Sequence, residues 1–157
     1  TFRSAPAGLN AEILSEIKNS NSISVHIRRT DFISNAKVAS YHGSCSPEYY
    51  VKAVSMLAKD LDQPVVYAFS DDPQWVKENI QLNFPTRYVD HNKGKSSYED
   101  LRLMSNCKHQ VIANSSFSWW AAWLNANENK KVIAPSKWFA DERVITKDVY
   151  PEAWIRI

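Results

Sequence analysis

Short apolar segments alternate with amphipathic segments along most of this chain, and this alternation limits the folds it can adopt. Segment 64–69 (PVVYAF) is almost wholly apolar, which is typical of a strand buried on both faces of a parallel sheet. The predicted strands are 23–27, 64–69, 86–89, 109–113 and 132–134, and the predicted helices are 9–18, 47–61, 74–80, 97–107 and 117–126. The order βαβαβαβαβ with short connections requires right-handed crossovers. The sequence therefore predicts an α/β fold, a Rossmann-like parallel sheet with helices on both faces, and a tail from 138 to 157 that packs back across it.

Length and charge limit the class of protein. A chain of 157 residues fits one domain. The formal net charge of +2 excludes a strongly basic nucleic-acid binder, although it leaves room for a local basic pocket. We expect no nucleic-acid partner.

Location can be predicted only from general features. No apolar run approaches the roughly 20 residues of a membrane span, and no signal peptide opens the chain. Cys45 and Cys107 are the only cysteines, which is typical of a reduced intracellular protein, and a disulfide between them stays open. We expect a cytoplasmic protein, with peripheral membrane association of the full-length protein as an alternative.

Polar residues gather where two of the predicted strands end. His26, Arg28, Arg29 and Asp31 follow or end the first strand, and a serine-rich turn at 114–118 follows the fourth. Each is a βα junction, which is where open α/β sheets bind ligands. Two such junctions side by side predict a site for an anionic ligand.

The scarcity of glycine restricts how that anion could be held. The chain has three glycines, so it contains neither a G-x-G-x-x-G motif nor a P-loop. If the sheet binds a nucleotide, arginine side chains and helix N-termini must hold its phosphates.

The two adjacent arginines should point to opposite sides of the strand end. One can offer its guanidinium to a phosphate pair while the other needs an acidic partner, and Asp31 is close enough in sequence to orient one of them. The alternative, that Arg28 and Arg29 are ordinary surface salt-bridge residues, stays open. His26 shares a strand face with Arg28, so it is either a satisfied core histidine or a contact to a base or ribose.

Three further features have competing interpretations. Ser115 or Ser116 is a natural helix N-cap, and the free N–H groups of that helix would also hold phosphate oxygens. The aromatic side chains at 119, 120 and 123 form either a sugar-stacking platform or part of the core, and we expect the core. The acidic pair at 71–72 is either a metal ligand or a helix cap. No set of His, Cys and acidic residues has convincing ligand spacing, so we predict no metal.

Taken together, these residues resemble a known family. Residues 26–31 (HIRRTD) match the H-x-R-R-x-D motif of the fucosyltransferases that use GDP-fucose. Residues 70–75 (SDDPQW), 100–105 (DLRLMS) and 113–120 (ANSSFSWW), in that order, resemble the bacterial α1,2-fucosyltransferases. The resemblance covers most of residues 22–138.

The resemblance implies a GT-B architecture, in which two Rossmann-like domains face each other and the C-terminal one binds the donor. Residues 1–157 would then be a single GDP-fucose-binding domain. We expect that the N-terminal acceptor-side domain is absent from this chain.

The resemblance also implies roles for individual residues. Arg28 would be catalytic, because it would contact the diphosphate and support the departure of GDP. His26 and Asp100 would lie near the guanosine. The expected donor-binding residues are His26, Arg28, Asp100, Ser115, Ser116 and Phe117, with Arg29 and Asp31 in supporting roles. No metal or other cofactor would be needed.

The function that the resemblance implies is inverting transfer of L-fucose from GDP-fucose to the 2-OH of a galactoside, with a galactose-containing glycan as acceptor. A general base cannot be identified, and Asp31 is only a weak candidate. The alternatives are a non-catalytic nucleotide-sugar binding module and a structural α/β domain with an arginine-rich surface. The chain by itself is expected to be inactive.

Overall fold

A parallel sheet forms the centre of the molecule. The computed structural model describes residues 2, 4–29, 43–141 and 143–157. Within them, six strands lie in the order β3-β2-β1-β4-β5-β6, all parallel. They are β1 (Asn21–Ile27), β2 (Pro64–Ser70), β3 (Thr86–Val89), β4 (His109–Val111), β5 (Val132–Ala134) and β6 (Ile155–Arg156). The predicted parallel α/β sheet is confirmed.

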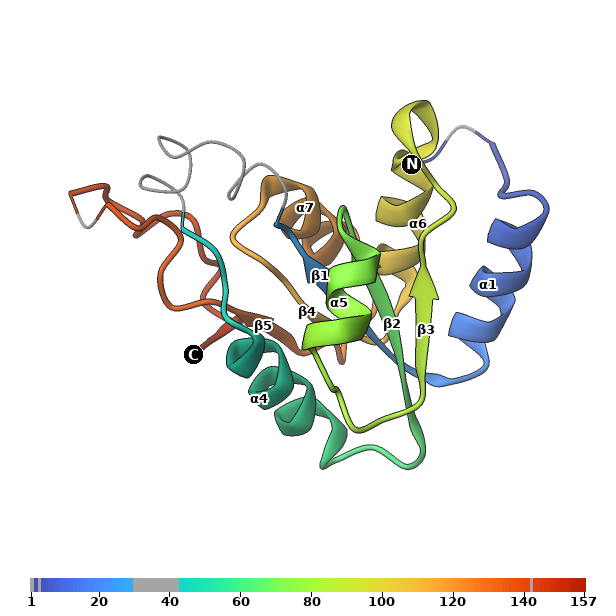
Figure 1. The fold of residues 1–157 in the computed structure, drawn as a ribbon, viewed down its shortest axis with the longest axis horizontal. Coiled ribbons are helices and arrows are strands. Elements are labelled where there is room, and N and C mark those ends of the chain that lie inside the picture. The colour runs from blue at the N-terminus through green and yellow to red at the C-terminus, as the bar shows by residue number, and fades with distance from the viewer. Residues whose placement is uncertain (1, 3, 30–42, 142) are drawn as a thin grey trace.

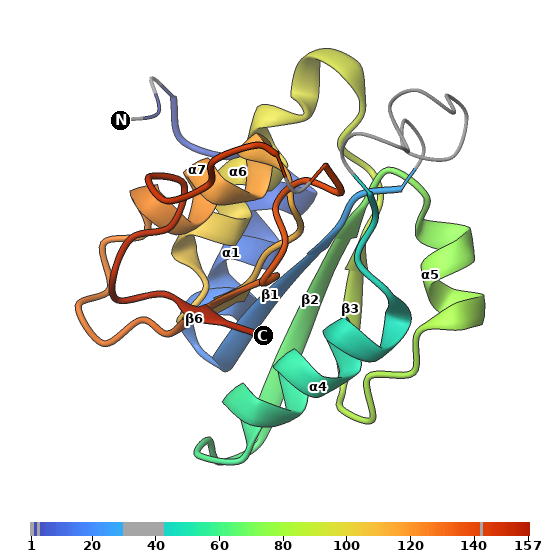
Figure 2. The ribbon, with the colours of Figure 1, turned by 90° about the vertical axis from the view of Figure 1, so that its left-hand side faces the viewer.

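Helices cover both faces of this sheet. They are α1 (Leu9–Lys18), α4 (Pro47–Ala58), α5 (Pro73–Asn79), α6 (Tyr98–Asn106) and α7 (Ser116–Leu124), with a short 3₁₀ turn, η1 (Gly94–Ser96), before α6. Figure 2 shows α4 and α5 on one side of the sheet and α1, α6 and α7 on the other. The fold is therefore a doubly wound α/β domain.

The two-sided burial follows from the strand sequences. In β2, Val66 packs into the cluster that contains Leu57 of α4, whereas Tyr67 and Phe69 pack against Ile17 of α1 on the opposite face. Successive side chains of a strand point to opposite faces, so a strand without polar alternation fills both cores.

Side chains cap two of the helices: α4 begins at its predicted residue, and α5 begins one residue before its predicted start. Ser46 accepts a hydrogen bond from the Tyr49 N–H at 3.3 Å, and Asp72 accepts one from the Trp75 N–H at 3.3 Å. A proline follows each cap at the first helical position. Each cap contributes about 1 kcal/mol to stability.

The C-terminal tail packs back against the sheet, as predicted, and also extends it. Trp138 and Trp154 are buried beside Ile112 and Val132. The Ile157 N–H donates to the Ala134 carbonyl at 3.2 Å. The tail thereby supplies β6, a strand that the sequence does not predict.

The chain order places a topological switch point between β1 and β4. The chain passes from β1 to β2 and β3 on one side, then returns through α6 to β4 on the other side of β1. The arrowhead of β3 in Figure 1 marks the edge at which the parallel strands end. Ligands of open α/β sheets bind outside this edge, at the switch point.

Candidate functional site

A cleft of about 1030 Å³ lies at the carboxyl edge of the sheet. Its walls come from the ends of β1, β2 and β3, the N-termini of α6 and α7, and residues 138–139 of the tail. The cleft lining includes all six predicted donor-binding residues: His26, Arg28, Asp100, Ser115, Ser116 and Phe117. Arg29 is not in the lining, and Asp31 lies outside the described residues.

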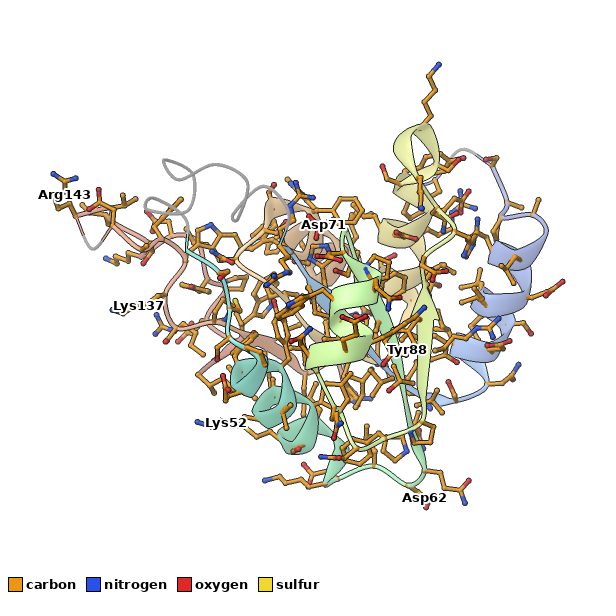
Figure 3. The ribbon with its side chains drawn as sticks, in the orientation of Figure 1. Lys52, Asp62, Asp71, Tyr88, Lys137 and Arg143 are labelled. Carbon is orange, nitrogen blue, oxygen red and sulfur yellow. The ribbon has the colours of Figure 1, made fainter. Side chains whose placement is uncertain are left out.

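Arg28 is paired with an acid from the neighbouring strand. Its Nε lies 3.4 Å from Asp71 Oδ2, and its side chain is 34% exposed. The Arg29 N–H donates to Asp71 Oδ1 at 3.0 Å. Figure 3 shows Asp71 just beyond the end of β2, at the carboxyl edge of the sheet. Asp71 therefore joins the ends of β1 and β2 and holds Arg28 at the cleft.

Arg29 turns the other way, as the strand geometry predicts. Its guanidinium carbon lies 3.7 Å from the ring centroid of Trp75, and its Nε lies 3.4 Å from Asp72 Oδ2. The face of an indole ring attracts a guanidinium, so Trp75 stabilises Arg29 in this position. The acidic partner that the sequence argument required is thus Asp72, which also caps α5, and the pairing expected of Asp31 falls on residues that the structure does not describe.

His26 is not a satisfied core residue. It is 5% exposed, and within the described residues its Nδ1 has no hydrogen-bond partner. Burial lowers the pKa of His26 to about 4, with Asp71 opposing this shift and Arg28 adding to it. The ring is therefore neutral at pH 7, and its Nδ1 is buried without a hydrogen-bond partner among the described residues. Leaving such a nitrogen unpaired costs about 1–3 kcal/mol, which a ligand hydrogen bond would offset.

The N-terminus of α7 lies beside His26 in the cleft wall. Ser115 is the N-cap by position, yet its side chain makes no capping hydrogen bond in the described structure. Ser116 begins the helix, and the Phe117 ring lies 5.6 Å from the His26 ring, centroid to centroid. Unpaired backbone N–H groups and the helix dipole make such a terminus attractive to phosphate oxygens.

Asp100 lies in the first turn of α6 and also lines the cleft. Asn92 Nδ2 donates to Asp100 Oδ1 at 2.7 Å. Burial raises the pKa of Asp100 to about 6, Asn92 opposes the shift, and Glu99 adds to it. The carboxylate is therefore charged at pH 7 but close to its titration range.

Several cleft residues are absent from the sequence-based site. Asp90, Asn92, Lys93, Gly94 and Ser97 line it between β3 and α6. This segment is a third βα junction, so the reasoning applied to β1 and β4 could have found it. Trp138 and Phe139 also line the cleft, but they come from the tail, whose path the sequence does not reveal.

The tryptophan prediction is correct for one residue and wrong for two. Trp119 stacks on Trp123 with centroids 5.2 Å apart and donates from Nε1 to the Val149 carbonyl at 2.7 Å. Trp120 and Trp123 are 50% and 53% exposed. On a helix that packs one face on the sheet, consecutive aromatics cannot all turn inward.

The remaining predictions concern the two cysteines, a metal site and a membrane span. Cys45 and Cys107 are free thiols. Among the described residues, no group of three or more His, Cys, Asp or Glu side chains could hold a metal ion, and no helix has the length and apolar character to cross a membrane.

Comparisons with known proteins agree with the geometry. A protein-family model described as glycosyl transferase family 11 matches residues 3–157. An alpha-1,2-colitosyltransferase of Escherichia coli is 41% identical over 151 residues, which are 95% of this chain and 52% of that protein.

Two further relatives extend this pattern. The O-antigen biosynthesis glycosyltransferase WbnK of Escherichia coli is 41% identical over 143 residues, 89% of this chain and 46% of that protein. A galactoside 2-alpha-L-fucosyltransferase of Caenorhabditis elegans is 22% identical over 153 residues, 85% of this chain and 39% of that protein. The chain spans about half the length of the two bacterial relatives.

Proposed function

The chain belongs to glycosyl transferase family 11, and from that premise we propose that its cleft binds GDP-fucose. The donor would serve inverting transfer of L-fucose to the 2-OH of a galactoside. The observation that carries this proposal is the convergence of Arg28 and the α7 N-terminus on one cleft at the switch point. Both are groups that bind phosphate.

The proposed chemistry places charge where these groups lie. The bond between the sugar C1 and the β-phosphate oxygen breaks as the acceptor oxygen bonds to C1 from the opposite face. GDP leaves with the bonding electron pair, and the hydroxyl proton passes to a base or to water. The sugar then passes through an oxocarbenium-like state while negative charge grows on the departing diphosphate. Fixed positive groups at that position lower the barrier more than they stabilise the bound donor.

We propose that this diphosphate needs no metal ion. Arg28 supplies the positive charge, and Asp71 holds its guanidinium in place. Transfer by a longer family protein that contains this domain should therefore persist in excess EDTA. Loss of transfer that magnesium restores would contradict this part of the proposal.

His26 and Asp100, which both line the cleft, suit a guanosine. His26 offers a neutral ring with an unsatisfied Nδ1, and Asp100 offers a carboxylate. Guanine carries N–H donors on its Watson–Crick edge, which a carboxylate accepts. The acceptor glycan would be bound by a part of a longer family protein that lies outside residues 1–157.

Calorimetric titration of the chain with GDP, GDP-fucose, UDP and ADP tests the proposal. We expect binding of the two guanine ligands, weaker by about 10- to 100-fold in Arg28→Ala because a charged hydrogen-bond donor is lost. Arg87→Ala is the matched control, since Arg87 is on β3, does not line the cleft and pairs only loosely with Glu16 at 4.0 Å. Equal affinity of wild type and Arg28→Ala for GDP would refute it.

Two alternatives have separate signatures. One relative at 41% identity is named a colitosyltransferase, so GDP-colitose is the second donor to titrate. A non-catalytic nucleotide-sugar binding module would bind GDP-fucose through the same residues, but the longer protein would neither transfer nor hydrolyse it.

A further inference from the structure

We propose that Asn92, which is hydrogen-bonded to Asn10 of α1, positions the Asp100 carboxylate to accept hydrogen bonds from the N1–H and 2-amino groups of a purine. This positioning makes the Asp100 side of the cleft selective for guanine over other bases. The inference rests on the proposed function, because it requires that Asp100 faces the base of the donor. It adds two residues, one of them on a helix far away in sequence, that would set the selectivity.

The side chains of Asn10 and Asn92 form a reciprocal amide pair. Asn10 Nδ2 donates to Asn92 Oδ1 at 2.9 Å, and Asn92 Nδ2 donates to Asn10 Oδ1 at 2.8 Å. Asn10 lies in the first turn of α1, and Asn92 lies in the segment between β3 and α6. The pair connects elements separated by 82 residues, and α1 and α6 lie side by side in Figure 1.

This pairing decides which way the Asn92 amide faces. Its carbonyl oxygen is used by Asn10, and its nitrogen donates both to Asn10 and, at 2.7 Å, to Asp100 Oδ1. A flipped amide would lose both bonds to Asn10 and would set its oxygen against the Asp100 carboxylate. The arrangement therefore presents a donor, and not an acceptor, to Asp100.

A second contact closes the network on the side away from Asp100. His91 Nε2 lies 2.8 Å from Asn10 Oδ1, the same oxygen that accepts from Asn92. That oxygen has no hydrogen to give, so His91 Nε2 must carry the proton. Asn10 is thus held from two directions.

The consequence for Asp100 is a fixed carboxylate that can still accept a hydrogen bond at each oxygen, because Oδ1 keeps a second lone pair. Oδ1 accepts from Asn92, and Oδ2 has no hydrogen-bond partner in the described part of the chain. Both Asp100 and Asn92 line the cleft. A carboxylate held this way accepts two parallel N–H bonds from guanine, one fewer from hypoxanthine, and is repelled by the N1 acceptor of adenine.

The experiment compares GDP with IDP, which lacks only the 2-amino group. Affinities are measured by calorimetry for the 157-residue chain and four variants: Asn92→Ala, Asn10→Ala, Asp100→Asn and Asn19→Ala. We expect the wild type to prefer GDP by at least about tenfold, the value of one hydrogen bond to a charged group. Asp100→Asn and Asn92→Ala should lose most of this preference, and Asn10→Ala should lose part of it.

Asn19→Ala is the matched control. Asn19 caps the other end of α1 and donates to the Ser15 carbonyl at 2.9 Å, away from the cleft. It should keep the wild-type ratio of GDP to IDP affinity. If Asn92→Ala does not fold, as judged by its thermal transition, the Asn10→Ala ratio decides the question.

The outcomes separate this inference from the function on which it rests. A wild-type chain that binds GDP and IDP equally would remove the role of Asp100 and the inference with it. A wild-type preference that Asp100→Asn abolishes but both Asn92→Ala and Asn10→Ala retain would overturn only the inference. A merely structural amide pair predicts lower stability in both asparagine variants with an unchanged ratio.

Discussion

At the scale of single residues, Asp71 has the widest influence on the cleft. It pairs with Arg28, accepts the Arg29 N–H and lies beside His26 closely enough to shift its pKa. Its pairing with Arg28 could not be predicted from the sequence, because it depends on strand register. Ile27 lies opposite Ser70, so the residues that follow them, Arg28 and Asp71, lie side by side. The acidic pair at 71–72 suggested only a cap or a metal ligand.

Replacing Asp71 by Asn should lower the ratio of GDP to GMP affinity about tenfold, since Arg28 is then no longer held at the diphosphate. Loss of the negative charge of Asp71 also favours binding of any phosphate ligand, so the affinity for GMP should rise slightly. The ratio of GDP to GMP affinity therefore isolates the effect of Asp71 on the position of Arg28. Calorimetry with both nucleotides measures it.

Asp72→Asn supplies the matched comparison. Asp72 pairs with Arg29 outside the cleft, and an amide oxygen can still accept the capping bond from Trp75. Its GDP to GMP ratio should remain that of the wild type. A ratio unchanged in Asp71→Asn as well would show that Arg28 needs no support from Asp71.

The titration of Asp100 predicts how binding depends on pH. Burial raises the pKa of Asp100 to about 6, so the charged fraction falls roughly tenfold between pH 7 and pH 5. A protonated carboxyl no longer accepts two N–H bonds, so GDP affinity should fall by about the same factor over this range. His26, with a pKa of about 4, stays mostly neutral throughout.

Titrations at pH 5, 6 and 7 test this dependence. Asp100→Asn reports the contribution of the phosphate groups of GDP, which also titrate near pH 6. The difference between the two pH profiles belongs to Asp100. Profiles that coincide would contradict the assignment.

At the scale of elements, a negative charge placed at the N-terminus of α7 should have opposite effects on the stability of the folded chain and on its affinity for GDP. Ser116→Asp puts a carboxylate at the first helical position, where it should stabilise the folded chain by about 0.3–1 kcal/mol through the helix dipole. The same carboxylate should abolish GDP binding, because it lies where the phosphate would bind and repels the phosphate oxygens. Urea unfolding and calorimetry give the two quantities.

Ser116→Asn separates the effect of charge from that of shape, because the asparagine side chain has nearly the same size as aspartate and carries no charge. It should retain most of the GDP affinity. If Ser116→Asp binds GDP normally, the diphosphate does not lie at this helix.

The elements also show what sequence reasoning can reach. Strands 86–89 and 132–134 match their predicted bounds. The second is a wholly apolar run, and the first combines β-branched and aromatic residues, which favour a strand. β6 was missed because both of its residues are exposed and its pairing with β5 is made by backbone groups alone. Five of the six clustered site residues lie at the ends of β1 and β4, whereas Asp100, on α6, came from the family resemblance. The third βα junction could have pointed to Asn92, but its pairing with Asn10 could be found only once α1 was placed beside that segment.

At the scale of the whole molecule, the proposed function requires only one side of a reaction site from this chain. The cleft is lined from the sheet edge, α6, α7 and the tail, and the chain spans about half the length of its bacterial relatives. Transfer requires an acceptor hydroxyl placed opposite the departing diphosphate, within about 3–3.5 Å of the sugar C1. The residues proposed to bind the phosphates and the base all line the cleft, and the proposed function assigns the acceptor to another part of the protein.

We therefore expect residues 1–157 to bind GDP and GDP-fucose weakly and to transfer no fucose to a galactoside. Binding should be weak because a donor held from one side leaves part of its surface in water. Transfer should be absent because nothing orients the acceptor, and orientation can lower the barrier by about 7–11 kcal/mol. The assay follows a radiolabelled donor into both glycan product and free sugar, with a full-length member of the family as the positive control. Efficient transfer by residues 1–157 would mean that the acceptor site lies on this chain, and the cleft beside Trp138 and Phe139 would then be the place to look for it.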